Sequence, residues 1–237
     1  APQRWLPPEK AFIKELIGVA ATSTEERLTP PVKPEDLAAL LDQMEADGRH
    51  DLRLATGLIA LFGLRPAELA VLTVKGDKLY CGHVKRNAAT MAQKAMPPRR
   101  CLPLDIAGRE GEGKRLLQLY SSGLVKLPTA VANEISKVKA KNTFQQVGHA
   151  FGQLLDRYEP WKNLVRSNPD ITPYSLRHSW AWRCHVCSNN ALHVRQAAAL
   201  MGHTVAVHQK NYGTWVDEAS LEAAVERYTE GLVAADH

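Results

Sequence analysis

Residues 171–212 read ITPYSLRHSWAWRCHVCSNNALHVRQAAALMGHTVAVHQKNY, and the rest of the chain is interpreted from this stretch. Arg177 lies at the start of an apolar helical pattern, His203 follows Gly202, and Tyr212 comes nine positions after His203. An arginine can neutralise a phosphate, a histidine can donate to a phosphate oxygen, and a phenol can act as a nucleophile. These residue types therefore indicate attack on a phosphodiester without a metal.

Three short boxes occur in order along the chain: G-L-R-P-A-E-L from Gly63, Y-S-L-R ending at Arg177, and L-M-G-H ending at His203, followed by Tyr212. Their order, and the spacing between the last box and the tyrosine, resemble the tyrosine recombinases, the phage-integrase family. That family has a G-L-R-x-x-E-L box, an H-x-x-R box, an L-G-H box and a nucleophilic tyrosine. The resemblance covers roughly residues 34–226, which is most of the chain.

The resemblance implies a role for each matching residue. Arg65 and Arg177 would hold the scissile phosphate, His203 would donate to a non-bridging phosphate oxygen, and Tyr212 would be the nucleophile. Attack by Tyr212 would give a 3′-phosphotyrosyl bond and a free 5′-hydroxyl. Because the bond energy stays in the protein–DNA link, the resemblance implies that no ATP, metal or other cofactor is needed.

Arg65 can also be interpreted from its own surroundings. It precedes a proline at an expected helix start, where free backbone N–H groups and the helix dipole favour an anion. The planar guanidinium can hold two phosphate oxygens. The alternative is a surface ion pair with Glu68, whose expected role is to orient Arg65 or its neighbours.

Tyr174 departs from the family pattern, because the family usually has a histidine at this position. Tyr174 lies three residues before Arg177 and shares a helix face with it. A phenol with a pKa of about 10 is a poor base at neutral pH, although it can donate a hydrogen bond to a phosphate. We therefore expect a positioning role for Tyr174, and we interpret the neighbouring His178 as a buried structural histidine.

The leaving 5′-oxygen needs a proton, which the family takes from a lysine in the sheet. Lys85, at the end of the second expected strand, aligns best with that lysine, and Lys94 in the following loop is the competitor. A solvent-facing lysine is the alternative for either residue. Further basic residues that could contact phosphates occur at Arg99 and Arg100, and at Lys137, Lys139 and Lys141.

The chain has four cysteines, and none of their spacings indicates a disulfide framework. Cys184 and Cys187 form one C-x-x-C pair within a helical pattern. A structural zinc site usually needs four ligands, so one pair favours packing over metal binding. We expect no metal site.

Composition places few limits on function. Hydrophobic residues make up 45% of the 237 residues and the net charge is +5, a sign that fits a polyanionic partner. No apolar run approaches the roughly 20 residues of a membrane helix, and the first ten residues lack a signal-peptide pattern. We expect a cytoplasmic, nucleoid-associated protein.

The patterns predict a mainly helical fold with a small three-stranded antiparallel sheet, as in the catalytic domain of the resembled family. Residues 1–33 are expected to be a lead helix and linker, and residues 34–237 the catalytic domain. The predicted strands cover residues 71–74, 78–84 and 99–104, and helices occupy most of the remainder, including residues 217–233 near the end. Residues 159–161, Glu-Pro-Trp, are expected to break a helix.

The resemblance predicts site-specific recombination of double-stranded DNA. It implies a tetramer on DNA, with a monomer expected in isolation. Without the N-terminal DNA-binding domain usual in that family, we expect weak and unselective binding. The alternatives are topoisomerase-like DNA relaxation, a DNA-binding relative impaired in catalysis by Tyr174, and a structural helical domain whose boxes match by chance.

Overall fold

The computed structural model describes residues 29–84, 97–141, 144–187 and 192–215, together with residues 222, 225 and 226. The predicted lead helix, both candidate lysines and most of the predicted C-terminal helix lie outside these residues. In chain order the described elements are α2 (Pro34–Ala46), α3 (His50–Phe62), the 3₁₀ helix η1 (Pro66–Val71), β1 (Leu72–Lys75), β2 (Lys78–Cys81), β3 (Arg99–Cys101), α5 (Glu112–Ser122), α6 (Thr129–Lys141), α7 (Phe144–Leu155), α8 (Glu159–Ser167), α9 (Ser175–His185), α10 (Val194–Met201), α11 (Val205–Tyr212) and the 3₁₀ helix η2 (Gly213–Trp215).

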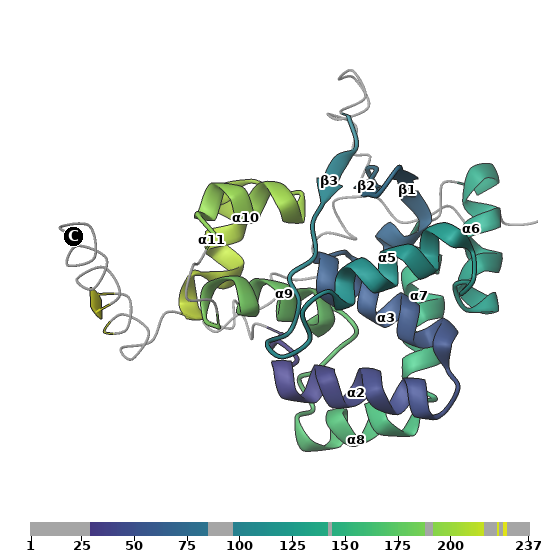
Figure 1. The fold of residues 1–237 in the computed structure, drawn as a ribbon, viewed down its shortest axis with the longest axis horizontal. Coiled ribbons are helices and arrows are strands. Elements are labelled where there is room, and N and C mark those ends of the chain that lie inside the picture. Colours follow the sequence, from purple (N-terminus) through teal and green to yellow (C-terminus); the bar gives the residue numbers. More distant parts are fainter. Residues whose placement is uncertain are drawn as a thin grey trace, which may run out of the picture.

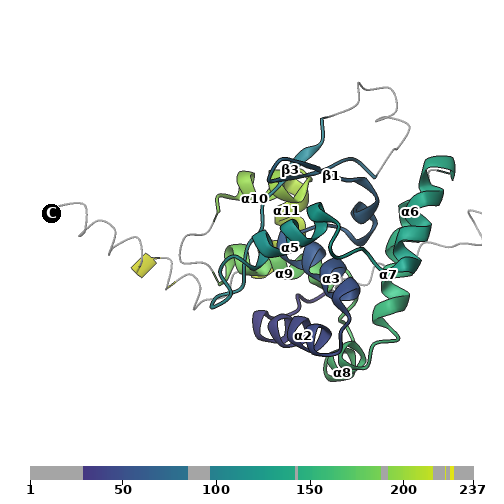
Figure 2. The ribbon, with the colours of Figure 1, turned by 45° about the vertical axis from the view of Figure 1, so that its right-hand side comes forward.

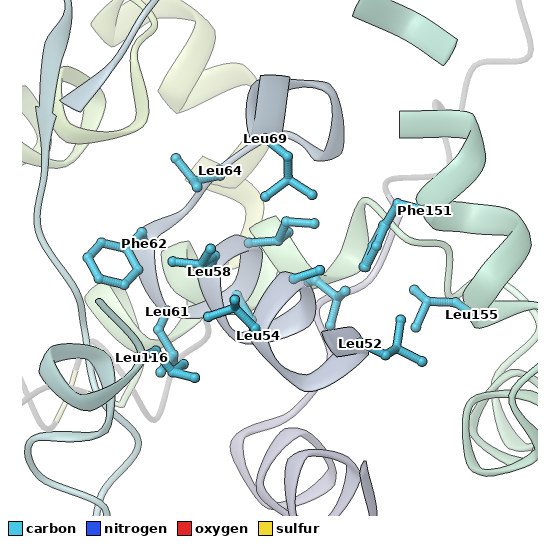
Figure 3. Close-up of a cluster of buried hydrophobic side chains, with 14 of the residues drawn as sticks. Leu52, Leu54, Leu58, Leu61, Phe62, Leu64, Leu69, Leu116, Phe151 and Leu155 are labelled. Atoms are coloured by element: carbon cyan, nitrogen blue, oxygen red, sulfur yellow. The ribbon is translucent and has the colours of Figure 1, made fainter. Parts of the chain in front are cut away.

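Helix α3 is the centre of the main core. It is buried from Leu52 to Phe62, and it packs against α9 on one side and α5 on another (Figure 1). Its apolar side chains meet those of α5 and α7 in one cluster (Figure 3). A Cβ on Gly57 would lie 2.4 Å from Leu116 of α5, so this glycine permits the close approach of the two helices.

The ends of the first helices follow local sequence signals. Pro34 occupies the first turn of α2, where the missing N–H costs nothing because that group has no intrahelical partner. Two acidic residues in the same turn interact favourably with the positive end of the helix dipole. Gly63 ends α3 in a left-handed conformation, with φ of 63°. That ending turns the chain directly into the Leu64-Arg65 segment, which begins the candidate site.

The sheet is three-stranded and antiparallel, in the order β1-β2-β3, which confirms the predicted fold class. It lies above α5 and α3 in both ribbon views (Figures 1 and 2). Leu72 pairs with Cys81, and Leu79 pairs with Cys101. Strand β3 ends at Cys101, earlier than predicted, because Pro103 has no N–H to continue a ladder.

The predicted helix break near residues 159–161 is present, since α7 ends at Leu155, but the segment itself is helical. The Glu159-Pro160-Trp161 segment begins α8, with the proline in the first turn and Trp161 buried. A proline is tolerated there because the first N–H groups of a helix have no intrahelical partner. Helix α8 packs beneath α2 (Figure 1).

A second, smaller core lies at the C-terminal side of the described chain. Helices α10 and α11 pack on each other and on the far half of α9, away from α6 and α7 (Figure 1). The buried members of this core are Trp180, Ala181, Cys184, Ala197, Met201 and Tyr212. In the described part of the chain, no helix is both long and apolar enough to cross a membrane.

Candidate active site

Arg65 and Glu68 are bound to each other at the start of η1. The backbone N–H of Arg65 donates to Oε2 of Glu68 at 2.8 Å, and its guanidinium Nη1 donates to Oε1 at 2.7 Å. Glu68 is 1% exposed, whereas the side chain of Arg65 keeps 21% of its surface accessible. The ion pair expected as the alternative for Arg65 is therefore present, and it holds the arginine at the edge of the site.

Three guanidinium groups surround the Glu68 carboxylate. Arg99 donates to both of its oxygens, at 3.1 and 2.8 Å, and Nη1 of Arg177 lies 3.7 Å from Oε2. Burial alone would raise the pKa of Glu68, but the charges of Arg99, Arg177 and Arg65 and the hydrogen bonds from Arg99 hold it below its usual value. Glu68 therefore stays ionised and fixes the arginines in place. Arg99, predicted as a candidate phosphate contact, is committed to Glu68 and to the carbonyl of Leu200.

Arg177 is fully buried and joins three elements. From α9 it donates to the carbonyl oxygen of Gly63, at the end of α3, and to that of Met201, at the end of α10, the latter at 2.6 Å. The last carbonyl groups of a helix lack intrahelical partners and carry partial negative charge, which suits a guanidinium. Burial, followed by the charge of Arg65, lowers the pKa of Arg177.

Gly202 brings His203 to this arginine. It ends α10 with φ of 70°, and a Cβ there would lie 2.8 Å from the Arg99 side chain. Both the left-handed backbone and the available space therefore require glycine. Nη2 of Arg177 donates to Nδ1 of His203 at 3.1 Å.

A chain of three histidine rings runs from this contact. Nε2 of His203 lies 2.8 Å from Nδ1 of His208, and Nε2 of His208 lies 2.6 Å from Nε2 of His185. Burial, followed by the charge of Arg177, lowers the pKa of His203 to about 3; burial, followed by the charge of His185, lowers that of His208 to about 4. Both nitrogens of His203 are thus engaged, so a hydrogen bond from His203 to a phosphate requires one of these contacts to exchange.

Tyr212 ends α11 with its hydroxyl inside the protein. The side chain is 4% exposed, and its hydroxyl lies 3.2 Å from Nδ1 of His178 on α9. Its ring packs against those of His208 and Trp215, with centroids 4.7 and 4.9 Å apart. Burial raises the pKa of Tyr212 to about 12, although the charge of Arg177 acts in the opposite direction.

Tyr174 forms the outer edge of the same cluster. Its ring is 38% exposed and contacts His178 edge-on, with centroids 5.1 Å apart. Together with Arg65 it borders a surface hollow of about 400 Å³, whose other lining residues include Phe144 and Pro173. The site thus has an exposed outer layer and a buried inner layer that contains Arg177 and Tyr212.

The structure brings together five of the six residues predicted for the site. Arg65, Arg177 and His203 are linked through Glu68 and Gly202, and Tyr212 and Tyr174 join them through His178. Lys85, like its competitor Lys94, lies outside the described residues. His178 and His208 contact the site, but their positions in the sequence gave only a weak signal. His178 lies one helical turn after Tyr174, a spacing that puts the two on one face.

No group of three or more His, Cys, Asp or Glu side chains among the described residues could hold a metal ion. Cys184 is buried in the second core, and Cys187 is exposed.

No protein-family model matches the chain. A protein named Excisase A, from Nostoc sp. (strain PCC 7120 / SAG 25.82 / UTEX 2576), is 27% identical over 163 residues, covering 69% of this chain and 31% of that protein. The chain therefore matches less than a third of the length of that relative. A solved structure titled "Crystal structure of XerA recombinase" aligns with a TM-score of 0.46 and 17% identity, covering 88% of this chain and 67% of that one.

The sequence similarity and the three boxes lead to the same family. Together they support a relationship of the chain to the tyrosine recombinases.

Proposed function

We propose that the chain is the DNA-cleaving part of a site-specific recombinase, which breaks and rejoins strands of double-stranded DNA through a covalent bond to Tyr212. One observation carries the proposal: a buried tyrosine hydroxyl lies in one cluster with Arg177, His203 and Arg65, residues that are up to 147 positions apart in the sequence. The relationship to the tyrosine recombinases supports the same function.

The chemistry is a transfer of the phosphate from one oxygen to another. The Tyr212 oxygen attacks phosphorus, and the bond from phosphorus to the 5′-oxygen breaks. The resulting 3′-phosphotyrosyl bond keeps the energy needed for rejoining, so no ATP is required. The 5′-oxygen takes its proton from a general acid, for which Lys85 or Lys94 is the prediction.

The arginines supply the charge that this step needs. A pentacovalent transition state carries more negative charge than the starting phosphodiester, and donors fixed in advance stabilise it most effectively. Glu68 holds Arg65 and Arg99 by direct ion pairs and lies 3.7 Å from Arg177. Arg65 lies nearest the surface hollow, and we propose that it meets the phosphate first.

A DNA-binding relative without catalysis is the second candidate. It is favoured by the phenol of Tyr174 where the family usually has a histidine, and by the complete burial of Arg177. On this proposal the arginine cluster stabilises the fold, and DNA binds over the outer surface. A tetramer on DNA is a further expectation under the first candidate.

Covalent capture separates the candidates. A nicked duplex with a phosphorothiolate at the cleavage position traps the tyrosyl intermediate, because the sulfur leaving group cannot rejoin. We expect a DNA-linked band on a denaturing gel for the native chain and none for Tyr212→Phe. Tyr80→Phe, which changes a tyrosine on β2, is the matched control and should keep the band.

A band that persists in Tyr212→Phe would assign the nucleophile to another residue. If the native chain binds DNA and yet forms no band, the DNA-binding candidate stands. Absence of DNA binding even at low salt would exclude both candidates, since phosphate contacts strengthen as salt falls.

A further inference from the structure

The hydroxyl proton of Tyr212 has to leave as the phenolic oxygen attacks. Burial makes this proton harder to remove, and water has little access to a side chain that is 4% exposed. A nearby acceptor with a free lone pair is therefore needed. The family position usual for a histidine is occupied here by Tyr174, whose phenol is a poor base.

We propose that His178 is the general base of the cleavage step, and that it takes the Tyr212 proton on Nδ1. This inference rests on the proposed function. The two side chains face each other across the packed helices α9 and α11, with Nδ1 of His178 3.2 Å from the Tyr212 oxygen. That distance is within the range expected of a general base and its proton donor.

The other histidines around Tyr212 are engaged elsewhere. His208 packs closely on the tyrosine ring, but its two nitrogens face His203 and His185 at 2.8 and 2.6 Å. The nitrogens of His203 face Arg177 and His208. Among the described histidines, His178 is the one whose nitrogen faces the hydroxyl.

The direction of the hydrogen bond follows from the neighbouring charge. The guanidinium of Arg177 has no lone pair and can act on the Tyr212 oxygen only as a donor. Its charge acts to lower the pKa of Tyr212 against the larger effect of burial. The phenolic proton is then directed to Nδ1 of His178. Burial, followed by the charge of Arg177, lowers the pKa of His178, so the resting imidazole is neutral and one of its nitrogens has a lone pair.

The atoms of the step balance. As the bond from the Tyr212 oxygen to phosphorus forms, the O–H bond breaks and His178 becomes an imidazolium. The bond from phosphorus to the 5′-oxygen breaks, and that oxygen takes a proton from the predicted lysine. Rejoining reverses each transfer, and His178 returns the proton to the phenolic oxygen.

Tyr174 gains a role from this assignment. It lies one helical turn before His178, and its ring contacts the imidazole edge-on. It also lines the surface hollow, to which His178 does not contribute. Tyr174 thus orients the imidazole and shields it from water, as a positioning residue.

The test is the rate of a single cleavage event on the phosphorothiolate duplex. His178→Asn puts an amide near the place of Nδ1 but cannot take the proton, so we expect cleavage to slow by about 100-fold or more with DNA binding unchanged. Added imidazole should restore part of the rate in His178→Gly. His50→Asn, at the exposed start of α3, is the matched control and should cleave at the native rate.

A second measurement needs no DNA. In ¹⁵N-histidine NMR spectra of the resting protein, Nδ1 of His178 should be the unprotonated nitrogen, and its signal should shift in Tyr212→Phe. A protonated Nδ1 would overturn the assignment, and so would native cleavage by His178→Asn. Failure of the proposed function gives a different pattern: the native chain forms no covalent complex, or Tyr212→Phe still forms one.

Discussion

The body around α3 and the small core around Tyr212 differ in how they are held. The body cluster joins residues from Val32 to Leu176 and includes every position from Leu58 to Phe62. Among the residues that the structure describes, the second cluster has six buried members, and it rests on one half of α9. Each buried large apolar side chain contributes about 1.5–3 kcal/mol, so the second region is the less stable one.

The residues of the candidate site are divided between these two regions of different stability. Arg65, Glu68 and Arg99 belong to the body, or to strands packed on it, whereas Tyr212 belongs to the smaller core. Opening free energies vary across a protein, and regions with few buried contacts open first. On the proposed function, the arrangement combines fixed charges for the phosphate with a nucleophile that can leave its buried position without unfolding of the whole chain.

The largest effect is expected at Glu68, whose carboxylate is surrounded by Arg65, Arg99 and Arg177. Glu68→Gln leaves buried arginines without their carboxylate, which should lower the free energy of unfolding by about 3–5 kcal/mol. Chemical denaturation followed by circular dichroism measures the change. Glu134→Gln is the control: it removes a surface pair with Lys137 and should cost about 0.2–0.5 kcal/mol. Equal losses in the two variants would contradict the central role of Glu68.

Two core truncations test the difference in stability directly. Leu58→Ala in the body should cost about 2–5 kcal/mol of global stability. Met201→Ala should instead speed hydrogen exchange in α10 and α11, because the smaller core opens on its own. Exchange measured by mass spectrometry resolves the segments. Uniform acceleration over α3 and α11 in both variants would show that the two regions unfold together.

Substitutions of two glycines, Gly202 and Gly48, test the close contact between Gly202, at the end of α10, and Arg99. Gly202→Ala should cost about 2 kcal/mol or more, since it strains a left-handed backbone and pushes on Arg99. Gly48 has a similar φ of 68° but no atom within 4 Å of an added Cβ. Gly48→Ala should therefore cost only the backbone strain, about 1–2 kcal/mol. Thermal unfolding of both variants measures how much stability each one loses. Equal losses would show that Arg99 does not occupy this space.

The histidines give the smallest expected effect, through pH. His203 and His208 have folded pKa values of about 3 and 4, below the value of 6.5 that applies when they are unfolded. Between pH 6.5 and 4 the unfolded chain therefore binds more protons, and stability falls as pH falls. A loss of about 1–2 kcal/mol is expected between pH 7 and pH 6, measured by denaturation at these two pH values. The slope should be shallower in His208→Gln, and an unchanged slope would contradict the buried neutral state of His208.

Local signals account for the parts of the structure that the sequence predicts well. Pro34 and Gly63 mark helix ends through backbone chemistry, and the apolar period of α3 follows from its burial. The helix break before Pro160 is predicted correctly, but the start of α8 is missed because the same proline that cannot continue one helix is tolerated in the first turn of the next. Whether a helix begins at Glu159 depends on whether α8 can pack against another element, and α2 provides that surface.

The candidate site shows the same limit. The boxes identify Arg65, Arg177, His203 and Tyr212 because their spacing along the chain is itself the signal. The contact between His178 and Tyr212 depends on how α9 packs against α11, and no local pattern contains it. The commitment of Arg99 to Glu68 likewise arises only when β3 lies beside η1.

The row of three rings beyond Arg177 has a consequence for hydrogen positions. A guanidinium can donate but never accept, so Nδ1 of His203 must present its lone pair and keep its proton on Nε2. Nε2 of His203 then donates to Nδ1 of His208, which keeps the proton of His208 on Nε2. Nε2 of His208 donates in turn to Nε2 of His185, so the proton of His185 is on Nδ1. The tautomer of His185 is thus decided by an arginine that lies two rings away. Any ligand that draws Arg177 aside frees all three rings to change tautomer together, without moving a heavy atom of the last one.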